Sequence, residues 1–397
     1  MNRIPETKSL SIGVIGVSLR GRILAEEAVN ASPGVLIGGA ADIDRNVLAE
    51  FCEKYGCFQT ADFREMLDRP EIGAVIVASP DYLHEEHAIA SLLAGKAVYL
   101  EKPMGITVES CDRILRCAME TGGKLYVGHN MRHFTVVRTM KNLIDSGEIG
   151  EVKAAWCRHF ISYGGDAYFK DWHADRTKSN GLLLQKAAHD IDILHWLCGS
   201  NTRRLTAMGQ LSLYGKIAAR RQADAPTPPV EFNEGNWPPE AQTGLNPVMD
   251  VEDISAVLLE MENGVQATYQ QCHFTPDAWR NYTVIGSRGR IENIGDTPGN
   301  AVVRLWNTRS DRYRAEGDLE VAPPAETGTH GGADPKIMKE FVRHMLFDEP
   351  ISISPLEARQ AVAAGIAATE SLRDGSTLRE IAPLSADLRE YFSLGQL

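Results

Sequence analysis

The sequence predicts an α/β domain built on a parallel sheet, followed by an α+β domain with a mostly antiparallel sheet. At about 150 residues per domain, the chain's 397 residues allow two or three domains. Short apolar stretches alternate with helical stretches through the first third of the chain, which is the pattern of right-handed βαβ units. After about residue 150, strand-like stretches follow one another instead, with one strong helix among them.

The first domain is predicted over residues 1–128. Its apolar stretches have the length of strands, and 74–79 (AVIVAS) is apolar almost throughout, as in a strand covered on both faces. The predicted strands are 9–16, 35–42, 74–79, 97–101 and 124–128. The predicted helices are 19–30, 44–55, 83–94 and 108–121.

The second domain is predicted over residues 129–354. Asn263-Gly264 and Arg288-Gly289 separate strand-like stretches in the manner of hairpin turns. Residues 222–249 are rich in proline, glycine and polar side chains, which predicts a long surface loop. The predicted strands are 152–160, 204–214, 254–262, 265–274, 281–286, 290–294 and 301–307. The predicted helices of this domain are 182–198 and 335–345, and a further helix, 355–373, follows it near the end of the chain.

Composition excludes several classes of protein. The apolar content of 43% is ordinary for a globular protein, and no apolar stretch approaches the roughly 20 residues of a membrane helix. The net charge of −12 argues against a nucleic-acid surface. The N-terminal sequence MNRIPETKSLSIG lacks the apolar region of a secretory signal. The seven cysteines are scattered and form no CxxC pair, so we expect reduced thiols in a cytoplasmic protein.

The turn after the first predicted strand has the character of a phosphate-binding turn. In GVIGVSLRG, glycines occupy the first and third positions of a dinucleotide fingerprint, and Ser18 stands at the second. A helix beginning near Leu19 would direct its free N–H groups at a pyrophosphate. The predicted cofactor-binding residues of this turn are Gly16, Ser18, Leu19 and Arg20.

Asp42 ends the second predicted strand, 21 residues after Gly21. A carboxylate at this distance accepts hydrogen bonds from the adenosine ribose and repels a 2′-phosphate. The sequence therefore favours NAD over NADP, although the nearby Arg45 weakens that preference.

Glu101-Lys102-Pro103 follows the strand 97–101. Ligands of parallel sheets bind beyond the carboxyl ends of the strands, so we expect Lys102 where nicotinamide and substrate meet. The proline makes a cis bond accessible and restricts the backbone of Lys102.

These segments resemble the glucose-fructose oxidoreductase / inositol dehydrogenase (Gfo/Idh/MocA) family. The matching segments, in order, are GVIGVSLRG, ASPDYLHEEHA, AGKAVYLEKPM, VGHNMRHF, GLLLQKAAHDIDILHWLCG, VIGSRGRIE and EARQAVAAGIAATESLRDG. The resemblance implies a Rossmann domain, then a domain with a large open sheet through which oligomers form. It also implies that the helix at about 355–375 packs back on the first domain.

The resemblance assigns roles by position. Lys102 would contact the reacting hydroxyl, and Asn130 and Arg132 would lie near the nicotinamide–substrate junction. The residues implied to line the cofactor are Ser79, Pro80, His84 and Glu101.

The predicted helix 181–198 carries the second catalytic group. The family has an aspartate and a histidine four residues apart here, and His189 matches the histidine. Gln185 occupies the aspartate position, where an amide forms hydrogen bonds but carries no proton. With an ordinary pKa of about 6.5, His189 is the expected general base. Lys186 is a further substrate-site candidate.

Other polar residues have weaker signals. The indole of Trp172 would suit the C–H face of a sugar or would anchor the loop, and His173 would bond a hydroxyl. His84/His87 and His129/His133 have helical metal-ligand spacing, but nothing completes a site, so we expect no metal. Asp334, directly before a proline, is predicted to N-cap the helix 335–345.

The leading functional hypothesis is an NAD-dependent dehydrogenase of a sugar or cyclitol carbinol, with His189 and Lys102 handling the proton. One alternative is a glycosidase that oxidises its sugar transiently with bound NAD, which Gln185 and Lys186 keep open. The other is an NAD-sensing regulator. We expect a homodimer or homotetramer that binds a sugar, cyclitol or glycoside and neither nucleic acid nor membrane. The loop 222–249 would shape a pocket or an oligomer contact.

Overall fold

The computed structural model describes residues 8–228, 230–297 and 299–393. The chain divides into two compact units. The first contains the chain up to His133, Thr327–Arg359 and the stretch from Pro383 on, and the second contains Phe134–Glu326 and Gln360–Ala382. Part of the N-terminal segment on which the absence of a signal was argued lies outside the described residues.

The first unit contains a six-stranded parallel sheet with the order β3-β2-β1-β4-β5-β6. This is the doubly wound order: β1 to β3 are added toward one edge of the sheet and β4 to β6 toward the other, so the strand order reverses between β1 and β4. The strands are β1 (Leu10–Ile15), β2 (Val35–Ala41), β3 (Phe58–Thr60), β4 (Ala74–Val77), β5 (Ala97–Leu100) and β6 (Leu125–Val127).

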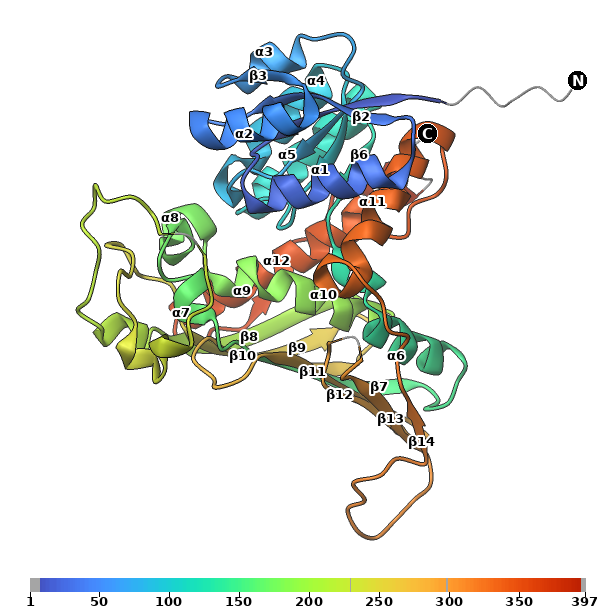
Figure 1. Cartoon of the computed structure of the whole chain (residues 1–397). Helices are drawn as coiled ribbons and strands as arrows, with labels where there is room; N and C mark the ends of the chain where they lie inside the picture. Colours follow the sequence, from blue (N-terminus) through green and yellow to red (C-terminus); the bar gives the residue numbers. More distant parts are fainter. Residues whose placement is uncertain (1–7, 229, 298, 394–397) are drawn as a thin grey trace, which may run out of the picture. The chain divides into compact units, whose positions relative to one another are not determined.

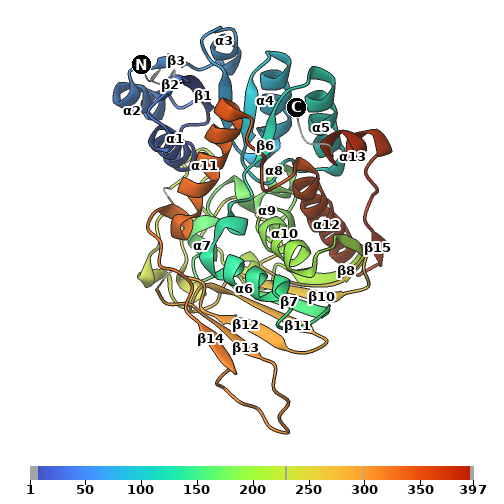
Figure 2. The same cartoon turned by 90° about the vertical axis from the view of Figure 1, so that its right-hand side faces the viewer.

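Helices cover both faces of this sheet. Figure 2 shows α1 and α11 together on one side and the adjacent pair α4 and α5 on the other. The helices of the unit are α1 (Leu19–Ala31), α2 (Arg45–Tyr55), α3 (Phe63–Leu67), α4 (His84–Leu93), α5 (Val108–Thr121), α11 (Thr329–Phe347) and α13 (Ala386–Ser393). Two short 3₁₀ turns, η1 (Asp81–Leu83) and η2 (Asn130–His133), follow the ends of β4 and β6.

Apolar side chains from distant parts of the sequence form the core of this unit. Leu24 of α1, Phe51 of α2 and Phe341 of α11 share one buried cluster with the strands. The participation of α11 explains why a segment more than 300 residues from β1 belongs to the first unit.

The second unit contains a nine-stranded sheet with the order β14-β13-β12-β11-β7-β10-β9-β8-β15. Its pairs are antiparallel except for β7 and β10, which confirms the mostly antiparallel prediction. The strands are β7 (Val152–Phe160), β8 (Thr202–Gln210), β9 (Ile254–Met261), β10 (Gln266–Cys272), β11 (Trp279–Gly286), β12 (Arg290–Ile294), β13 (Val302–Trp306), β14 (Leu319–Val321) and β15 (Arg379–Glu380).

The two predicted hairpin turns are confirmed. Asn263-Gly264 joins β9 to β10, with Gly264 at a φ of +85°, and Arg288-Gly289 joins β11 to β12. Helices α6 and α10 pack on one face of the sheet (Figure 1). The helices are α6 (Thr135–Asp145), α7 (Gly164–Ala167), α8 (Arg176–Ser179), α9 (Leu182–Gln185) and α10 (Ala187–Cys198). A further helix, α12 (Pro355–Arg373), runs from the first unit's segment into that of the second.

The prediction of one continuous helix over 182–198 is wrong. The helix is interrupted at Lys186, so that α9 ends at Gln185 and α10 begins at Ala187. The loop 222–249 contains no strand or α-helix among its described residues, only the 3₁₀ turns η5 (Glu234–Asn236) and η6 (Pro239–Ala241). Another such turn, η4 (Tyr214–Lys216), precedes the loop, and η3 (Trp172–Ala174) lies between α7 and α8.

Candidate functional site

The turn between β1 and α1 is closed around its two fingerprint glycines. Gly16 has a φ of +85°, and a Cβ there would lie 2.8 Å from the carbonyl oxygen of Ala78. A Cβ on Gly21 would lie 1.9 Å from the carbonyl oxygen of Gly16. Neither position tolerates a side chain without a backbone shift. Ser18 precedes the first residue of α1, and both Ser18 and Leu19 are exposed, so this helix end is open to solvent, as binding of a pyrophosphate there requires.

Asp42 holds this turn from the end of β2. Its Oδ2 accepts from the backbone N–H of Val17 at 2.8 Å, and its Oδ1 accepts from that of Asp44 at 2.9 Å. Each oxygen keeps a second lone pair with which to accept from a ribose hydroxyl. Arg45 is exposed at the first position of α2.

Two exposed apolar side chains flank the same turn. Leu19 is 69% exposed and Ile43, directly after Asp42, is 91% exposed. An apolar base or sugar face would cover such side chains, so the turn fits a dinucleotide in its chemistry as well as its backbone. Ile43 had not been singled out from the sequence, where its signal is only an apolar residue directly after the strand-end carboxylate.

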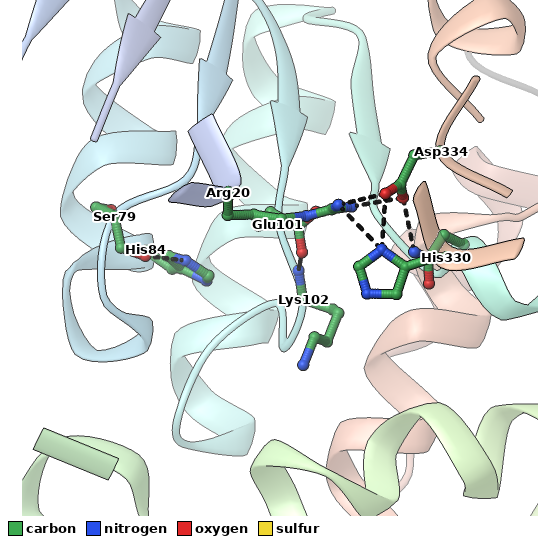
Figure 3. Close-up of polar contacts among 8 residues, drawn as sticks. Arg20, Ser79, His84, Glu101, Lys102, His330 and Asp334 are labelled. Carbon is green, nitrogen blue, oxygen red and sulfur yellow. Dashed lines mark hydrogen bonds and ion pairs between the residues drawn. The ribbon is translucent and has the colours of Figure 1, made fainter. Parts of the chain in front are cut away.

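Arg20 lies in a buried cluster of charges (Figure 3). Its Nε donates to Glu101 at 2.7 Å, and its two terminal nitrogens donate to the two oxygens of Asp334 at 2.7 and 3.0 Å. Asp334 also accepts from Asn130 Nδ2 at 2.8 Å and lies 2.7 Å from His330 Nδ1. The guanidinium thereby joins the phosphate-binding turn to the end of β5 and to α11.

The prediction that Asp334 caps the helix 335–345 is wrong. Helix α11 begins at Thr329, and its first turn is distorted by positive φ angles from His330 to Gly332. The carboxylate of Asp334 is turned to Arg20 instead. Although burial would raise the pKa of Asp334, hydrogen bonds from His330 and Arg20 hold that pKa far below its ordinary value.

The end of β4 is tied to the Lys-Pro segment by one imidazole. Ser79 and Pro80 follow β4 and lead into η1. The ring of His84 lies between two carbonyl oxygens, 2.9 Å from that of Ser79 and 2.7 Å from that of Pro103. His84 therefore connects two strand ends, which is a positioning role beside the predicted cofactor.

Lys102 follows the buried end of β5. The peptide bond between Lys102 and Pro103 is cis, and the backbone N–H of Lys102 donates to Glu101 Oε2 at 3.0 Å. Figure 3 shows the Lys102 side chain extending away from the cluster of Arg20, Glu101 and Asp334. Its ammonium group is thus directed away from the neighbouring carboxylates. Of the two residues expected near it, Asn130 bonds Asp334, and Arg132 Nη1 donates to Glu357 at 2.9 Å.

In the second unit, Gln185 and His189 flank the break between α9 and α10. Both are buried, with 6% and 8% of their surfaces exposed. Lys186, at the break, places its ammonium nitrogen 4.7 Å from the ring centre of Tyr168 and 5.9 Å from that of Tyr163. These distances are typical of cation–π contacts, so the two tyrosines orient a cation next to the helix that carries His189.

His173 is held by a carboxylate. Its Nδ1 lies 2.7 Å from Oδ1 of Asp171, and because a carboxylate only accepts, Nδ1 carries a hydrogen; in the neutral imidazole Nε2 is then the acceptor. The ring stacks on Trp172 at 3.8 Å and meets the edge of Tyr168 at 5.4 Å. The Asp171–His173 pair is suited to accepting a hydrogen bond from a hydroxyl, a role that the sequence suggested for the histidine without its partner.

Asp190, the residue after His189, is fully buried at the centre of a hydrogen-bond network that had not been predicted. Its carboxylate is hydrogen-bonded by His159 (2.9 Å), Tyr269 (3.0 Å), Arg280 (2.8 Å) and Tyr282 (2.6 Å). Burial would raise the pKa of Asp190, but Arg280 and His159 hold it far below its ordinary value. This network fastens the first turn of α10 to the sheet and so positions His189.

The described residues lack the features of a metal centre and of a membrane span. Among the described residues there is no group of three or more His, Cys, Asp or Glu side chains placed to hold a metal ion. No helix within the described ranges is both long and apolar enough to cross a bilayer. All seven cysteines are free thiols.

The doubly wound sheet and its glycine turn define the first unit as a dinucleotide-binding domain of the oxidoreductase type. Residues 10–129 match the oxidoreductase family with an NAD-binding Rossmann fold, and residues 137–292 match the GFO/IDH/MocA C-terminal domain. The chain belongs to the GFO/IDH/MocA family of oxidoreductases, as its motifs indicated.

Relatives of the chain include an oxidoreductase and several inositol dehydrogenases. The chain is 25% identical over 328 residues to YteT of Bacillus subtilis (strain 168), named as a putative oxidoreductase, covering 72% of this chain and 75% of that protein. It is 32% identical over 201 residues to inositol 2-dehydrogenase 2 of Saccharopolyspora erythraea, covering 50% of this chain and 57% of the relative.

Solved structures share the fold over almost the whole chain. A levoglucosan dehydrogenase in complex with NADH and L-sorbose aligns with a TM-score of 0.77 at 19% identity, covering 95% of this chain and all of the other. At that identity the likeness concerns the fold.

Proposed function

We propose that this chain is an NAD-dependent dehydrogenase that transfers a hydride between the nicotinamide and a carbinol carbon of a sugar or cyclitol. One observation carries the proposal. The parallel register places Gly16 after β1, Asp42 after β2 and Lys102 after β5, all at the carboxyl edge of one sheet. The residues proposed to bind the cofactor and the lysine proposed to stabilise an alkoxide thus share the edge at which such sheets bind ligands.

The chain's own residues have distinct parts in this reaction. Bound NAD supplies a hydride acceptor at nicotinamide C4. The ammonium of Lys102 donates to the reacting oxygen and stabilises the negative charge that develops there as the hydride departs. His189 takes the hydroxyl proton, and Gln185 orients the hydroxyl without taking up a proton. The pairing of Lys102 with His189 on one substrate rests on the family resemblance.

NAD is preferred over NADP because the Asp42 carboxylate is fixed by two backbone N–H groups at the ribose position. A 2′-phosphate would bring a second negative charge against a carboxylate that cannot turn away. The remaining residues proposed to line the cofactor are Ser18, Leu19, Arg20, Ser79, Pro80, His84, Glu101 and Asn130.

A redox glycosidase is the second candidate. Gln185 replaces the proton-carrying aspartate of the family pattern, and Lys186 adds a cation over two tyrosines beside it. Such a site would oxidise a sugar with bound NAD, eliminate the aglycone, add water and reduce the product again, with no net change in NAD.

The deciding experiment incubates the purified protein with NAD and a panel of free sugars, inositols, and aryl and alkyl glycosides. NADH absorbance and release of free sugar are followed together. NADH formed in proportion to one polyol supports the dehydrogenase. Aglycone release that requires NAD without consuming it makes the chain a redox glycosidase. Binding of NAD with neither signal contradicts both enzymes and favours a cofactor-sensing regulator.

The proposal includes a cytoplasmic homo-oligomer. Free thiols agree with a reducing compartment. One face of the nine-stranded sheet carries exposed apolar side chains, Met208 on β8 and Leu258 on the neighbouring β9, as in a face that a second copy covers.

A further inference from the structure

A pocket of about 230 Å³ lies within the second unit, between α7 and the loop 222–249. None of the residues given a catalytic or cofactor role above lines it. In Figure 1 the loop runs beside α7 and α8. Hydrogen bonds fasten it there, from Asn236 to Asp166 of α7 and from the N–H of Asn246 to the carbonyl of Phe169.

The polar wall of the pocket offers hydrogen-bond acceptors. Asp166 is 97% buried, and its Oδ1 accepts from Lys170 (3.1 Å), Asn236 (2.6 Å) and Gln242 (3.1 Å). Within the described ranges, its Oδ2 accepts a single long bond of 3.4 Å, from the N–H of Asn233. Gln242 is equally buried, and its Oε1 has no hydrogen-bond partner within the described part of the chain. A buried acceptor without a donor is costly, so these two oxygens favour a ligand that donates O–H groups.

The other wall of the pocket is aromatic. Trp237 and Phe232 line it while remaining 49% and 63% exposed, and Tyr214 closes its inner end. Large aromatic side chains on a loop present a flat apolar surface beside polar groups. A ligand with an apolar face and a rim of hydroxyls matches both walls, which is the chemistry of a sugar ring.

The charge and the size of the pocket restrict the class of ligand further. The carboxylate of Asp166 is balanced by Lys170, and Glu234 also lines the pocket, so an anionic sugar would meet uncompensated negative charge. Sites for drug-sized ligands have volumes of about 300–1,000 Å³, and this pocket is smaller. A single neutral ring suits it better than a chain of rings.

The pocket adjoins the residues to which the substrate was assigned in this unit. Helix α7 carries Asp166 into the pocket, and its flanking residues Tyr163 and Tyr168 contact Lys186. Tyr168 also contacts His173. The pocket therefore lies one short helix away from the candidate substrate side chains.

We propose that this pocket binds a second, neutral sugar ring, so that the substrate is a disaccharide or a glycoside with a sugar aglycone rather than a free monosaccharide. This inference rests on the proposed function, because the first ring is the one that is oxidised.

Paired substrates test the inference. Initial rates of NADH formation are compared for glucose with maltose and cellobiose, and for galactose with lactose and melibiose. We expect at least one disaccharide to exceed its monosaccharide in kcat/KM by about tenfold or more, the gain of one good aromatic contact. Trp237→Ala should abolish that gain and leave monosaccharide oxidation within about twofold. Tyr313→Ala, which removes an exposed aromatic side chain outside the pocket, should change neither.

Binding without turnover separates this inference from the proposed function. Saturation-transfer NMR on the full chain, without cofactor, should detect at least one of these disaccharides, with a signal that Trp237→Ala or Phe232→Ala reduces. Such binding without any sugar oxidation upholds the pocket and contradicts the dehydrogenase. Monosaccharide oxidation with no disaccharide preference and no effect of either variant overturns the pocket. A change of oligomeric mass in Trp237→Ala also overturns it, because the aromatic wall would then be a subunit contact.

Discussion

At the scale of single residues, the chemistry depends on how the chain fixes flexible side chains. Lys102 has a long aliphatic stem, yet its backbone is held by Glu101, by the following proline and, through Pro103, by His84. His173 is held by Asp171, and Lys186 by two tyrosine rings. In each case, neighbours reduce the entropy that the polar group would lose on binding substrate.

Replacing the lysine tests its proposed role. Lys102→Met should lower kcat/KM by about 10²–10⁴-fold, because the developing alkoxide loses its cation. The dissociation constant of NADH, measured by fluorescence titration, should stay within about threefold. Lys339→Met on the exposed side of α11 is the matched control and should behave as wild type. Full activity in Lys102→Met would exclude the lysine from the reaction.

A buried histidine makes stability depend on pH. His273 is fully buried, and neither ring nitrogen has a hydrogen-bond partner among the described residues. Burial, with the charges of His159 and Lys186, lowers its pKa well below 6.5. The unfolded chain takes up this proton near pH 6.5 and the folded chain does not, so stability falls as pH drops below about 6.5.

His273→Phe should remove this histidine's contribution to the pH dependence of stability while keeping the ring contacts with Tyr168 and Phe169. We expect the decrease in Tm between pH 8 and pH 5 to be smaller in the variant than in wild type. Relative to wild type, the Tm of the variant should therefore be higher by a larger amount at pH 5 than at pH 8. Equal decreases in the two proteins would show that this imidazole is not a buried neutral group.

At the scale of elements, function depends on backbones that approach closely. The end of β1, the start of α1 and the residues after β4 meet at Gly16. Helix α10 begins next to a carboxylate shared by three strands, β7, β10 and β11. These contacts decide where the helix ends point.

Substitutions at two glycines with positive φ distinguish the effect of a steric clash with nearby backbone from the effect of backbone strain alone. Gly16→Ala and Gly122→Ala each cost about 1–2 kcal/mol for the left-handed conformation. Only at Gly16 does the new methyl group also meet backbone atoms, since nothing lies within 4 Å of a Cβ on Gly122. We expect Gly16→Ala to weaken NADH binding at least tenfold and Gly122→Ala to leave it unchanged, by calorimetric titration. Equal affinities would contradict the assignment of this turn to the pyrophosphate.

The Asp190 network can be weakened in steps. Asp190→Asn leaves the partly buried Arg280 with only the carboxylate of Asp296, 4.0 Å away, which costs about 3 kcal/mol, and should lower both Tm and kcat. Tyr282→Phe removes one of the four hydrogen bonds and should cost about 1 kcal/mol with little change in kcat. Thermal melts and steady-state rates measure both. A wild-type kcat in Asp190→Asn would show that the network does not position His189.

At the scale of the whole molecule, the open sheet has the properties of an assembly surface. Along β9, buried and exposed side chains alternate, so one face is covered within the unit and the other is not. Exposed apolar side chains on the open face are costly in water unless a partner covers them.

We expect the wild-type chain to have the mass of a dimer or tetramer by light scattering after size-exclusion chromatography. Leu258→Lys should reduce that mass, because a charge would be buried in the contact. Leu36→Lys, at an exposed position of β2 in the first unit, is the control and should not change it. An unchanged mass in Leu258→Lys would exclude this face as the contact.

Much of the first unit could be predicted because its signals are local. Buried strands are short apolar stretches, and the Gly16 turn, the Asp42 strand end and the Lys102-Pro103 segment each lie within a few residues. The hairpins at Gly264 and Gly289 were predictable for the same reason. The short elements β3, α3 and β15 were missed because their stretches are too brief to show a period.

The contacts that complete the site could not be predicted. Arg20 and Asp334 are 314 residues apart, and Asp190 and Arg280 are 90 apart, so no spacing rule connects them. The helix break at Lys186 leaves no proline or glycine as a signal. The Asp334 cap was mispredicted because the local rule for residues before a proline does not include the distant Arg20, which the buried carboxylate of Asp334 contacts instead.

The sequence by itself determined the class of the chain and its two-part fold, and it predicted the types of residue that would meet cofactor and substrate. These follow from hydrophobic period, glycine placement and strand-end chemistry, which act over a few residues. The tertiary structure alone decided which carboxylate neutralises Arg20, which side chains surround Asp190, and that the loop 222–249 forms a pocket with Asp166. Such pairings arise because buried charges and donors must find partners wherever folding brings them, and distance along the chain does not limit that choice.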